Sequence, residues 1–270
     1  MDCGELLAAR TERDGGTIVK IGENVRIGRD FCVIAGPCAI ESEEQLERIA
    51  KAVSLSGASA IRGGAYKART SPYDFQGLGR QGIELLTSVG RRYNMPTVTE
   101  ITDTAQVREF DKVDVIQIGA RNMQNFPLLL TAADTGKPIL LKRGFGSTLE
   151  ELILSAEYIL RRGNPNVILC ERGIRSFSSE CRYMLDLSAV PVLKSKTHLP
   201  VIVDPSHAAG SAEYVPQLSL AAVAAGADGL IIEVHDAPCT ALCDARQAIS
   251  PDVLADIIKR ANGILPFAIK

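Results

Sequence analysis

Eight short apolar runs, spaced along the chain between residues 31 and 234, constrain the fold more than any other feature of the sequence. They are rich in Val, Ile and Leu and lack a clean alternation of apolar and polar residues. This pattern is typical of parallel strands that are buried on both faces. The runs are FCVIAG (31–36), SAIRGG (59–64), PTVTE (96–100), VIQIGA (115–120), PILLK (138–142), VILCERG (167–173), PVIVD (200–204) and GLIIEV (229–234).

Longer amphipathic stretches separate these runs, and several begin with residues that cap helices. Eight strands that alternate with helices predict an α/β fold of the (β/α)8 or TIM-barrel type. A doubly wound sheet is the alternative, but it usually has a Gly-rich dinucleotide turn after its first strand, and here GPCAIESEE follows. The expected caps are Ser42 with Gln45, Asp103 with Gln106, Ser147 with Glu150, and Ser250 before Pro251 for a last helix near 251–262.

Residues 17–28, TIVKIGENVRIG, differ from the rest of the chain. Two alternating stretches flank Gly22-Glu23-Asn24, which predicts a β-hairpin ahead of the barrel. We therefore expect an N-terminal extension with this hairpin over residues 1–29, and a catalytic barrel over residues 30–270. A hairpin of this length could cover the bottom of the barrel but is too short to be a regulatory domain.

Composition excludes several classes of function. With 30 Lys and Arg against 32 Asp and Glu, the formal net charge is -2, so bulk charge does not favour binding to nucleic acid or to an anionic membrane. The sequence has no apolar run of about 20 residues, as a membrane helix needs, and no signal-peptide core. We expect a cytoplasmic protein whose seven cysteines are free thiols.

Charged and nucleophilic side chains follow the apolar runs. Active sites of barrels lie where strands end, so this placement predicts a site at one mouth. Several Lys and Arg around one mouth favour an anionic ligand, most simply one that carries phosphate. The residues at the strand ends are Cys38, Arg62, Lys67, Arg69, Glu100, Arg121, Lys142, Arg143, Glu171, Arg172, Asp204, His207, Glu233 and His235.

Cys38, His207, Glu233 and Asp244 form a second group with metal-binding chemistry. One thiolate, one imidazole and two carboxylates suit a divalent transition metal such as Mn, Fe, Co or Zn. Each also has a structural explanation: Cys38 as a small buried residue, His207 as the cap of a turn, and Asp244 as a helix N-cap. Glu233 is harder to explain in this way, because a carboxylate at the end of a buried strand needs a partner.

Several longer motifs resemble those of 3-deoxy-D-arabino-heptulosonate 7-phosphate (DAHP) synthases, in the compact type I beta branch related to KDO-8-phosphate synthase. The resemblance covers about residues 30–250. It implies a (β/α)8 barrel that condenses phosphoenolpyruvate with D-erythrose 4-phosphate in the first step of the shikimate pathway. The motifs are AGPCAIES (35–42), RGGAYKARTSPYDFQGLG (62–79), VTE (98–100), DVIQIGARNMQN (114–125), KPILLKRG (137–144), NPNVILCERGIRSF (164–177), LDLSAVP (185–191), LPVIVDPSHAAG (199–210) and ADGLIIEVH (227–235).

The resemblance also implies a role for each matching residue. The metal ligands would be Cys38, His207, Glu233 and Asp244. Phosphoenolpyruvate would be bound by Arg62, Lys67, Arg121, Lys142 and Arg172. The aldose phosphate would be bound by Arg69, Thr70 and Ser71. Catalytic groups would be Lys67, His207, Glu100 and Asp204. The cofactor would be a divalent metal, Mn²⁺ first and Fe²⁺, Co²⁺ or Zn²⁺ next, in a homo-oligomer, tetramer or dimer.

Two stretches depart from the motifs. Ala68 stands where DAHP synthases have Pro in a KPRTS-like segment, and ALCDARQAI replaces a segment close to ALSDGPQSL around Asp244. Loss of a Pro loosens the loop that would bind the aldose. Two alternatives therefore stay open: a KDO-8-phosphate-like or specialised synthase that uses another phosphorylated aldose, and a non-catalytic paralogue.

Overall fold

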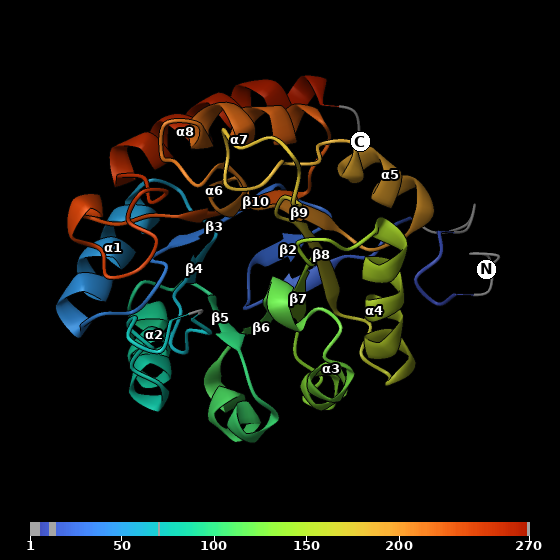
Figure 1. Ribbon diagram of the computed structural model, residues 1–270, viewed down its shortest axis with the longest axis horizontal. Helices are drawn as coiled ribbons and strands as arrows, with labels where there is room; N and C mark the ends of the chain where they lie inside the picture. Colours follow the sequence, from blue (N-terminus) through green and yellow to red (C-terminus); the bar gives the residue numbers. More distant parts are fainter. Residues whose placement is uncertain (1–5, 11–14, 70, 269–270) are drawn as a thin grey trace.

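The chain folds into a closed barrel of eight parallel strands (Figure 1), and the α/β TIM-barrel prediction is confirmed. The computed structural model describes residues 6–10, 15–69 and 71–268. Pairing of the last barrel strand with the first, with Gly229 opposite Cys32, closes the sheet. The strands are β3 (Cys32–Gly36), β4 (Ala60–Arg62), β5 (Thr97–Ile101), β6 (Val115–Ile118), β7 (Ile139–Lys142), β8 (Val167–Glu171), β9 (Val201–Val203) and β10 (Gly229–Glu233).

Helices surround the barrel and cover the outer faces of its strands (Figure 1). After β5 the outer layer is a 3-10 helix, Thr104–Lys112, and after β9 a short helix precedes the covering one. Among the described residues, none of the helices has the length and apolar character needed to cross a membrane. The helices are α1 (Glu43–Leu55), α2 (Arg80–Arg92), α3 (Phe126–Ala133), α4 (Leu149–Arg161), α5 (Ala189–Lys196), α6 (Pro205–Ala209), α7 (Val215–Ala224) and α8 (Pro251–Ile264).

Three of the four predicted helix starts are confirmed. Ser42 accepts a hydrogen bond from the Gln45 amide at the start of α1, and Ser250 caps α8 in the same way. Asp103 and Gln106 form a complete capping box on the 3-10 helix. These side chains satisfy amide groups that the first turn of a helix leaves unpaired.

The fourth predicted start is wrong by one residue. Thr148 and Glu151 form the capping box of α4, where Ser147 and Glu150 were expected. The amide of Ser147 donates to the Gly144 carbonyl at 3.2 Å, so Ser147 belongs to the turn after β7. The extended backbone that an N-cap needs therefore falls on Thr148, with φ −69° and ψ 165°.

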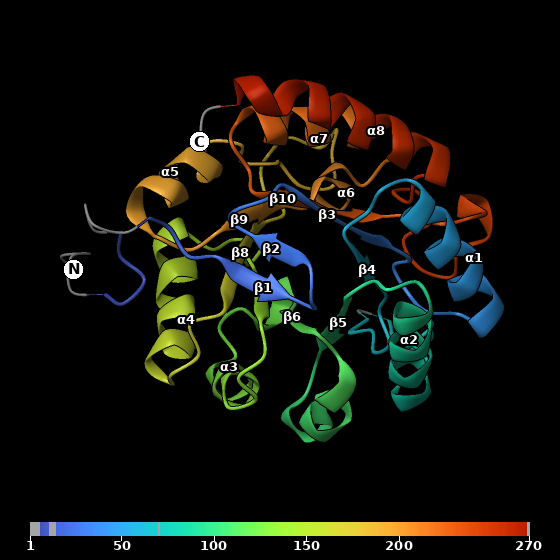
Figure 2. The same ribbon diagram turned by 180° about the vertical axis from the view of Figure 1, so that it is seen from behind.

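The predicted hairpin closes one end of the barrel. It consists of β1 (Val19–Ile21) and β2 (Val25–Ile27), which pair antiparallel and cross in front of the barrel strands in Figure 2. The turn at Gly22 has a φ of +57°, and a β-carbon there would lie 2.6 Å from Pro96, just before β5. The hairpin thus covers the amino-terminal ends of the strands. Its buried side chains join a core inside the barrel, made of Val19, Ile21, Ile27, Ile34, Val98, Leu140, Ile168, Ile202 and Ile231 among others.

Candidate active site

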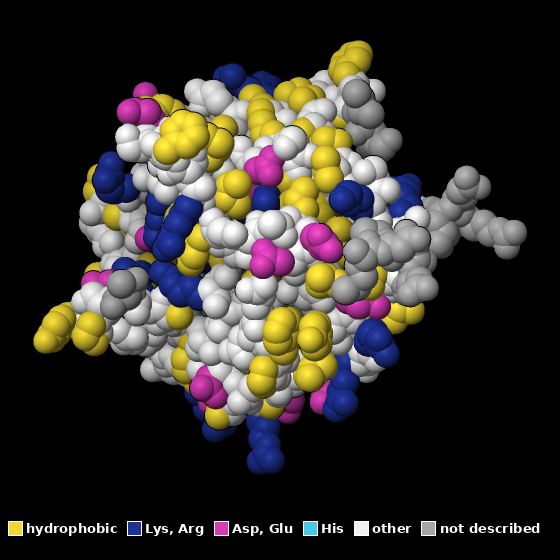
Figure 3. Space-filling view, turned by 45° about the vertical axis from the view of Figure 1, so that its right-hand side comes forward, with side chains coloured by type: hydrophobic (Ala, Val, Ile, Leu, Met, Phe, Trp, Pro, Cys, Tyr) yellow, Lys and Arg dark blue, Asp and Glu magenta, His cyan; other side chains and the backbone are white. Residues whose placement is uncertain are grey.

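The carboxyl ends of the strands surround a polar cavity of about 240 Å³. Both cationic side chains and the half-buried carboxylates of Glu100 and Asp244 line this cavity. In the space-filling view, Lys and Arg side chains gather in one area of the visible face and are scattered elsewhere (Figure 3). Because like charges repel, several cations around one small cavity favour an anionic ligand. The cationic side chains that line the cavity are Lys67, Arg69, Arg121, Arg172 and Arg182.

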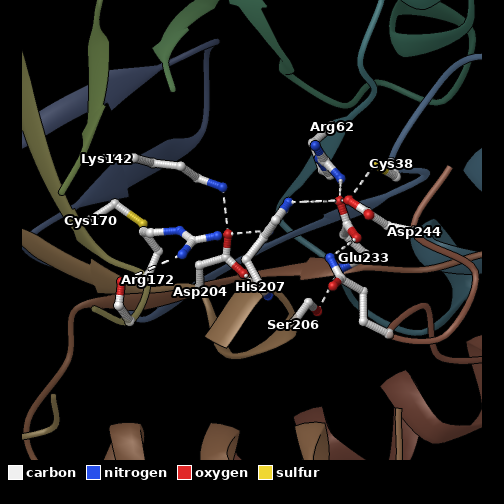
Figure 4. Close-up of polar contacts among 12 residues, drawn as sticks. Cys38, Arg62, Lys142, Cys170, Arg172, Asp204, Ser206, His207, Glu233 and Asp244 are labelled. Carbon is white, nitrogen blue, oxygen red and sulfur yellow. Dashed lines mark hydrogen bonds and ion pairs between the residues drawn. The ribbon is translucent and has the colours of Figure 1, made fainter. Parts of the chain in front are cut away.

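The four residues with metal-binding chemistry meet beside this cavity (Figure 4). His207 Nε2 lies 3.3 Å from Glu233 Oε1 and 3.9 Å from Asp244 Oδ2. The Cys38 thiol lies 3.4 Å from Asp244 Oδ2. Four segments far apart in sequence therefore bring together a sulfur, a nitrogen and carboxylate oxygens.

A strained loop brings Asp244 to this group. Asp244 has a φ of +52°, a conformation that residues other than Gly adopt rarely. Arg182 holds the loop, since its Nη1 is 3.3 Å from Asp244 Oδ1 and donates to Gln247 Oε1 at 3.0 Å. The structure thus stabilises at Asp244 a backbone conformation that is intrinsically unfavourable.

The His207 imidazole is oriented by Asp204 (Figure 4). Asp204 caps α6 by accepting from the His207 amide, and its Oδ2 lies 2.7 Å from His207 Nδ1. The same oxygen forms a buried ion pair with Lys142. Burial alone would raise the pKa of Asp204, but His207 and Lys142 lower it well below its usual range. Asp204 therefore stays ionised and leaves Nε2 of His207 directed toward Glu233.

The carboxylate of Glu233 is held from two sides. Arg62 Nη1 donates to its Oε1 at 2.8 Å, and Gln247 Nε2 donates to its Oε2 at 2.6 Å. Burial opposes ionisation, yet the charges of His207 and Arg62 lower the pKa of Glu233 below its usual range. The buried partner that this strand-end carboxylate requires is Arg62.

Cys38 lies between a cation and a second cysteine. Lys67 Nζ is 3.1 Å from the Cys38 sulfur, and the Cys243 sulfur is 2.9 Å away. Cys243 also accepts a hydrogen bond from Arg69 Nη1 at 2.6 Å. The hydrogen bond between the two sulfurs raises the pKa of Cys38 and lowers that of Cys243.

Two aromatic rings hold Arg172. The rings of Phe145 and Tyr183 stack with centroids 5.2 Å apart, and the Arg172 guanidinium lies 5.0 Å and 4.2 Å from the two centroids. A cation over an aromatic face is attracted by the electrons of the ring. Arg172 is almost completely buried, and this burial lowers its pKa.

The position of the Glu100 carboxylate requires the absence of a side chain at the neighbouring Gly119. Gln117 Nε2 donates to its Oε2 at 3.1 Å, while a β-carbon on Gly119 would overlap its Oε1. Gly119 has ordinary backbone angles, so the requirement here is space rather than conformation. The GARN segment thus leaves room for a carboxylate at the end of β5.

Several charged residues at strand ends lie outside the cavity lining. Arg62, Lys142, Asp204 and Glu233 lie beneath it in the ion pairs described above, whereas Arg143, Glu171 and His235 lie apart from the site. Arg143 pairs with Glu171 at 2.9 Å and with Asp186 at the same distance. His235 lies beside Gln45 Nε2 at 3.2 Å. These groups are satisfied within the protein. Arg143 and Glu171 follow Lys142 and Cys170, which point into the barrel, and alternate residues of a strand point to opposite faces.

Of the residues expected to bind the aldose phosphate, Arg69 lines the cavity. Its Nε is 3.3 Å from Asp74 Oδ2. Ser71 is half-buried in the same loop and accepts from the Tyr73 amide. Thr70 lies outside the described residues.

The sequence matches a family model over residues 16–262, and that model is described as the DAHP synthetase I family. The chain belongs to this family. It is 48% identical over 257 residues to phospho-2-dehydro-3-deoxyheptonate aldolase of Thermotoga maritima, covering 94% of this chain and 75% of the relative. It is 36% identical over 265 residues to 2-dehydro-3-deoxyphosphooctonate aldolase of a Geobacter species, covering 91% of this chain and 94% of the relative.

Solved structures agree with this assignment to the DAHP synthetase I family. The crystal structure of the Thermotoga maritima DAHP synthase superposes with a TM-score of 0.93 at 45% identity, over 97% of this chain and 77% of that one. A truncated form of the same enzyme has a TM-score of 0.90 at 42% identity, over 97% and 96%. The resemblance expected from the motifs is confirmed.

The donor set of this DAHP synthetase I family member suits a divalent transition metal. A thiol, an imidazole nitrogen and two carboxylates combine softer and harder ligands, as borderline ions prefer. Hydrogen bonds to neighbouring residues already orient two of these ligands: Asp204 contacts the other nitrogen of the His207 ring, and Gln247 donates to the Glu233 carboxylate. The residues present therefore fit a divalent transition metal of the group Mn²⁺, Fe²⁺, Co²⁺ and Zn²⁺.

Sequence reasoning missed several groups that shape the site of this family member. Arg182, Phe145 and Tyr183 come from loops that have no periodicity to place them. The sequence feature that could have indicated them is the pair Arg182-Tyr183, in the polar loop that follows the strand-end Arg172. Cys243 was noted as an unusual residue, but its contact with Cys38 follows only from the fold.

Proposed function

We propose that the protein is a DAHP synthase, which joins phosphoenolpyruvate to D-erythrose 4-phosphate and releases inorganic phosphate. The observation that carries the proposal is that Cys38, His207, Glu233 and Asp244 converge beside a cavity lined by cations. Membership of the DAHP synthetase I family supports it, with higher identity to the DAHP synthase relative than to the octonate one.

We assign phosphoenolpyruvate to the cationic wall made of Arg62, Lys67, Arg121, Lys142 and Arg172. A trianion must be neutralised and oriented before its C3 carbon can attack an aldehyde. Arg62 is 4% exposed, and its buried Nε has no hydrogen-bond partner among the described residues. Because an unpaired buried donor is unfavourable, an oxygen of the ligand would satisfy it.

Arg69, Thr70 and Ser71 would bind the phosphate of the aldose. Arg69 is positioned for this role at the cavity edge, where Asp74 and Cys243 are its partners in the absence of an anion. The exposed Ala68 lines the same edge. A phosphate would bind Arg69 through a charge-assisted pair.

The chemistry then needs two bonds to form and one to break. C3 of phosphoenolpyruvate attacks the aldehyde carbon, water adds at C2, and the C2–O bond to phosphate breaks. Lys67 would give a proton to the new alkoxide, and His207 would hold a proton beside phosphoenolpyruvate. Of the two water protons, one would leave with the phosphate and the other would replace the proton that Lys67 gives up. Glu100 would orient Lys67 and water, and Asp204 would orient Lys142 and His207. Bound at Cys38, His207, Glu233 and Asp244, a divalent metal, Mn²⁺ by our expectation, would supply Lewis-acid polarisation of the aldehyde oxygen.

We assign the catalytic barrel to residues 30–270 and an extension with the hairpin to residues 1–29. A homo-oligomer, either a tetramer or a dimer, and a location in the cytoplasm stay predictions. Sedimentation analysis of the purified chain tests the oligomeric state.

A panel of phosphorylated aldoses, assayed with and without metal, tests the proposed function. Erythrose 4-phosphate and arabinose 5-phosphate are each mixed with phosphoenolpyruvate, and phosphate release and the product mass are measured. We expect turnover with erythrose 4-phosphate, its loss on chelation, and its return with Mn²⁺. Preference for arabinose 5-phosphate would indicate the KDO-8-phosphate-like alternative, and no turnover with either aldose under any metal would favour a non-catalytic paralogue.

Two variants separate the two substrate sites. Arg69→Ala is expected to raise KM for the aldose, and Arg172→Ala to raise KM for phosphoenolpyruvate. Arg80→Ala is the matched control, because Arg80 is exposed at the start of α2, pairs with Glu84 and does not line the cavity. If Arg69→Ala and Arg172→Ala raise both KM values alike, the assignment of two sites is wrong.

A further inference from the structure

Cys243 is placed as a metal ligand would be. Its side chain is 2% exposed, and its sulfur lies 2.9 Å from the Cys38 sulfur. Both cysteines are free, and the separation is well beyond the roughly 2.05 Å of a disulfide bond. Two buried sulfurs therefore point toward the same place.

That place is shared with the other donors. The ligand atoms of Cys38, Cys243 and Asp244 all lie within 4.8 Å of one another, and so do those of His207, Glu233 and Asp244. Asp244 belongs to both groups, so the two triads share one carboxylate (Figure 4 shows Asp244 between Cys38 and Glu233). The left-handed backbone at Asp244 sets the direction of its side chain relative to the preceding Cys243.

The charges around the two sulfurs suit a second thiolate. Lys67 Nζ lies 3.1 Å from the Cys38 sulfur, and Arg69 Nη1 donates to the Cys243 sulfur at 2.6 Å. With Arg62 on Glu233, three cations and a dication would face two thiolates and two carboxylates. Burial of anionic ligands is favourable only when such partners compensate their charge.

We propose that Cys243 is a second thiolate ligand of the metal centre, which adds a fifth donor to Cys38, His207, Glu233 and Asp244. The inference rests on the metal centre of the proposed function and adds to it a sulfur ligand. Two thiolates shift a site toward the softer ions Zn²⁺, Fe²⁺ and Co²⁺, and away from Mn²⁺. When metals compete at equal concentration, we therefore expect this chain to select softer ions than a one-thiolate site would, whereas an excess of Mn²⁺ alone should still fill the site and restore turnover.

Cobalt spectroscopy tests the number of sulfur ligands without an activity assay. The full chain is reduced, freed of metal and titrated with Co²⁺ under anaerobic conditions, and the near-ultraviolet thiolate-to-cobalt absorption is measured. We expect Cys243→Ser and Cys38→Ser each to lose about half of this absorption, because each removes one of two thiolates. Cys239→Ser is the control, because Cys239 is exposed on the same loop and outside both triads.

An unchanged absorption in a folded Cys243→Ser variant that binds one equivalent of Co²⁺ would overturn the proposal. X-ray absorption of the wild-type chain loaded with Zn²⁺ gives a second measurement that needs no variant: two sulfur neighbours support the proposal and one contradicts it. If the wild-type chain binds neither ion, the metal centre itself is wrong, which is a different outcome from a centre with one sulfur. A competition titration measures the ratio of the affinities for Zn²⁺ and Mn²⁺. We expect Cys243→Ser to lower this ratio by about tenfold or more.

Discussion

The guanidinium carbon of Arg172 lies 4.2 Å from the centre of the Tyr183 ring, and the Phe145 ring that stacks on Tyr183 lies 5.0 Å from the same carbon. A buried cation is thus held in place by two aromatic faces rather than by a carboxylate. This arrangement leaves the hydrogen-bond donors of Arg172 largely available to a ligand, since among the described residues they make one long hydrogen bond, of 3.4 Å, to the Gly173 carbonyl.

Loss of the Tyr183 ring should weaken binding of phosphoenolpyruvate. A cation–π contact contributes about 0.5–2 kcal/mol, so Tyr183→Leu should raise KM for phosphoenolpyruvate by about 2- to 30-fold. KM for the aldose should change little. Tyr183→Phe keeps the ring and should behave as the wild type in steady-state kinetics. If Tyr183→Phe and Tyr183→Leu raise KM for phosphoenolpyruvate equally, the ring does not position Arg172.

The buried pair of Lys142 and Asp204 should behave as a unit in stability measurements. Removal of one partner leaves an uncompensated buried charge, at a cost of about 3–5 kcal/mol. Lys142→Met and Asp204→Asn should each lower the free energy of unfolding in urea, and the double variant should lose less than the sum. The double variant should still be inactive, because Lys142 is assigned to phosphoenolpyruvate; additive stability losses would contradict coupling.

Acid should destabilise the protein through Asp204. His207 and Lys142 lower the pKa of this carboxyl in the folded state, although burial opposes them. The unfolded chain takes up the proton near the ordinary Asp pKa of about 3.9, and the folded chain does so only at lower pH. The contribution of Asp204 is therefore complete above about pH 5 and is lost as pH falls below that range. Urea titrations from pH 7 to pH 3 should show a shallower loss of stability for Asp204→Asn than for the wild type; parallel curves would exclude this group as the source.

Gly119 should not tolerate a methyl group. A β-carbon there would overlap the Glu100 carboxylate, and overpacking of this kind costs about 1–3 kcal/mol. Gly119→Ala should lower both kcat and the free energy of unfolding. Gly146→Ala is the matched control, since within the described part of the chain no heavy atom lies within 4 Å of the added carbon. Similar behaviour of the two variants would show that Glu100 moves aside freely.

Much of this fold follows from the sequence because strand burial and helix capping are local signals. The eight apolar runs each became a strand, and Ser42, Asp103 and Ser250 each began a helix. Thr148 replaced Ser147 as a cap because the turn at Gly144 takes up one more residue than the pattern reveals. Such an offset arises from the path of a turn, which periodicity does not encode.

The site is predictable in part for a similar reason. Strand ends of a barrel converge, so Cys38, His207 and Glu233 could be grouped before the fold was known. Arg143 and His235 also follow strands, but they point to the outer side, and only the direction of each side chain separates them from Arg172. Arg182 and Tyr183 come from a loop whose path depends on tertiary contacts.

The hairpin at the other end of the barrel has a consequence for the charges at the mouth. Val19, Ile21 and Ile27 seal the interior from below, and the column of side chains between them and the site is apolar. Such a column screens charge poorly. Arg172 lines the cavity and forms no ion pair with a carboxylate among the described residues. Its electric field is therefore weakened mainly on the side that opens to water, and an incoming anion that displaces this water would meet this cation with little screening.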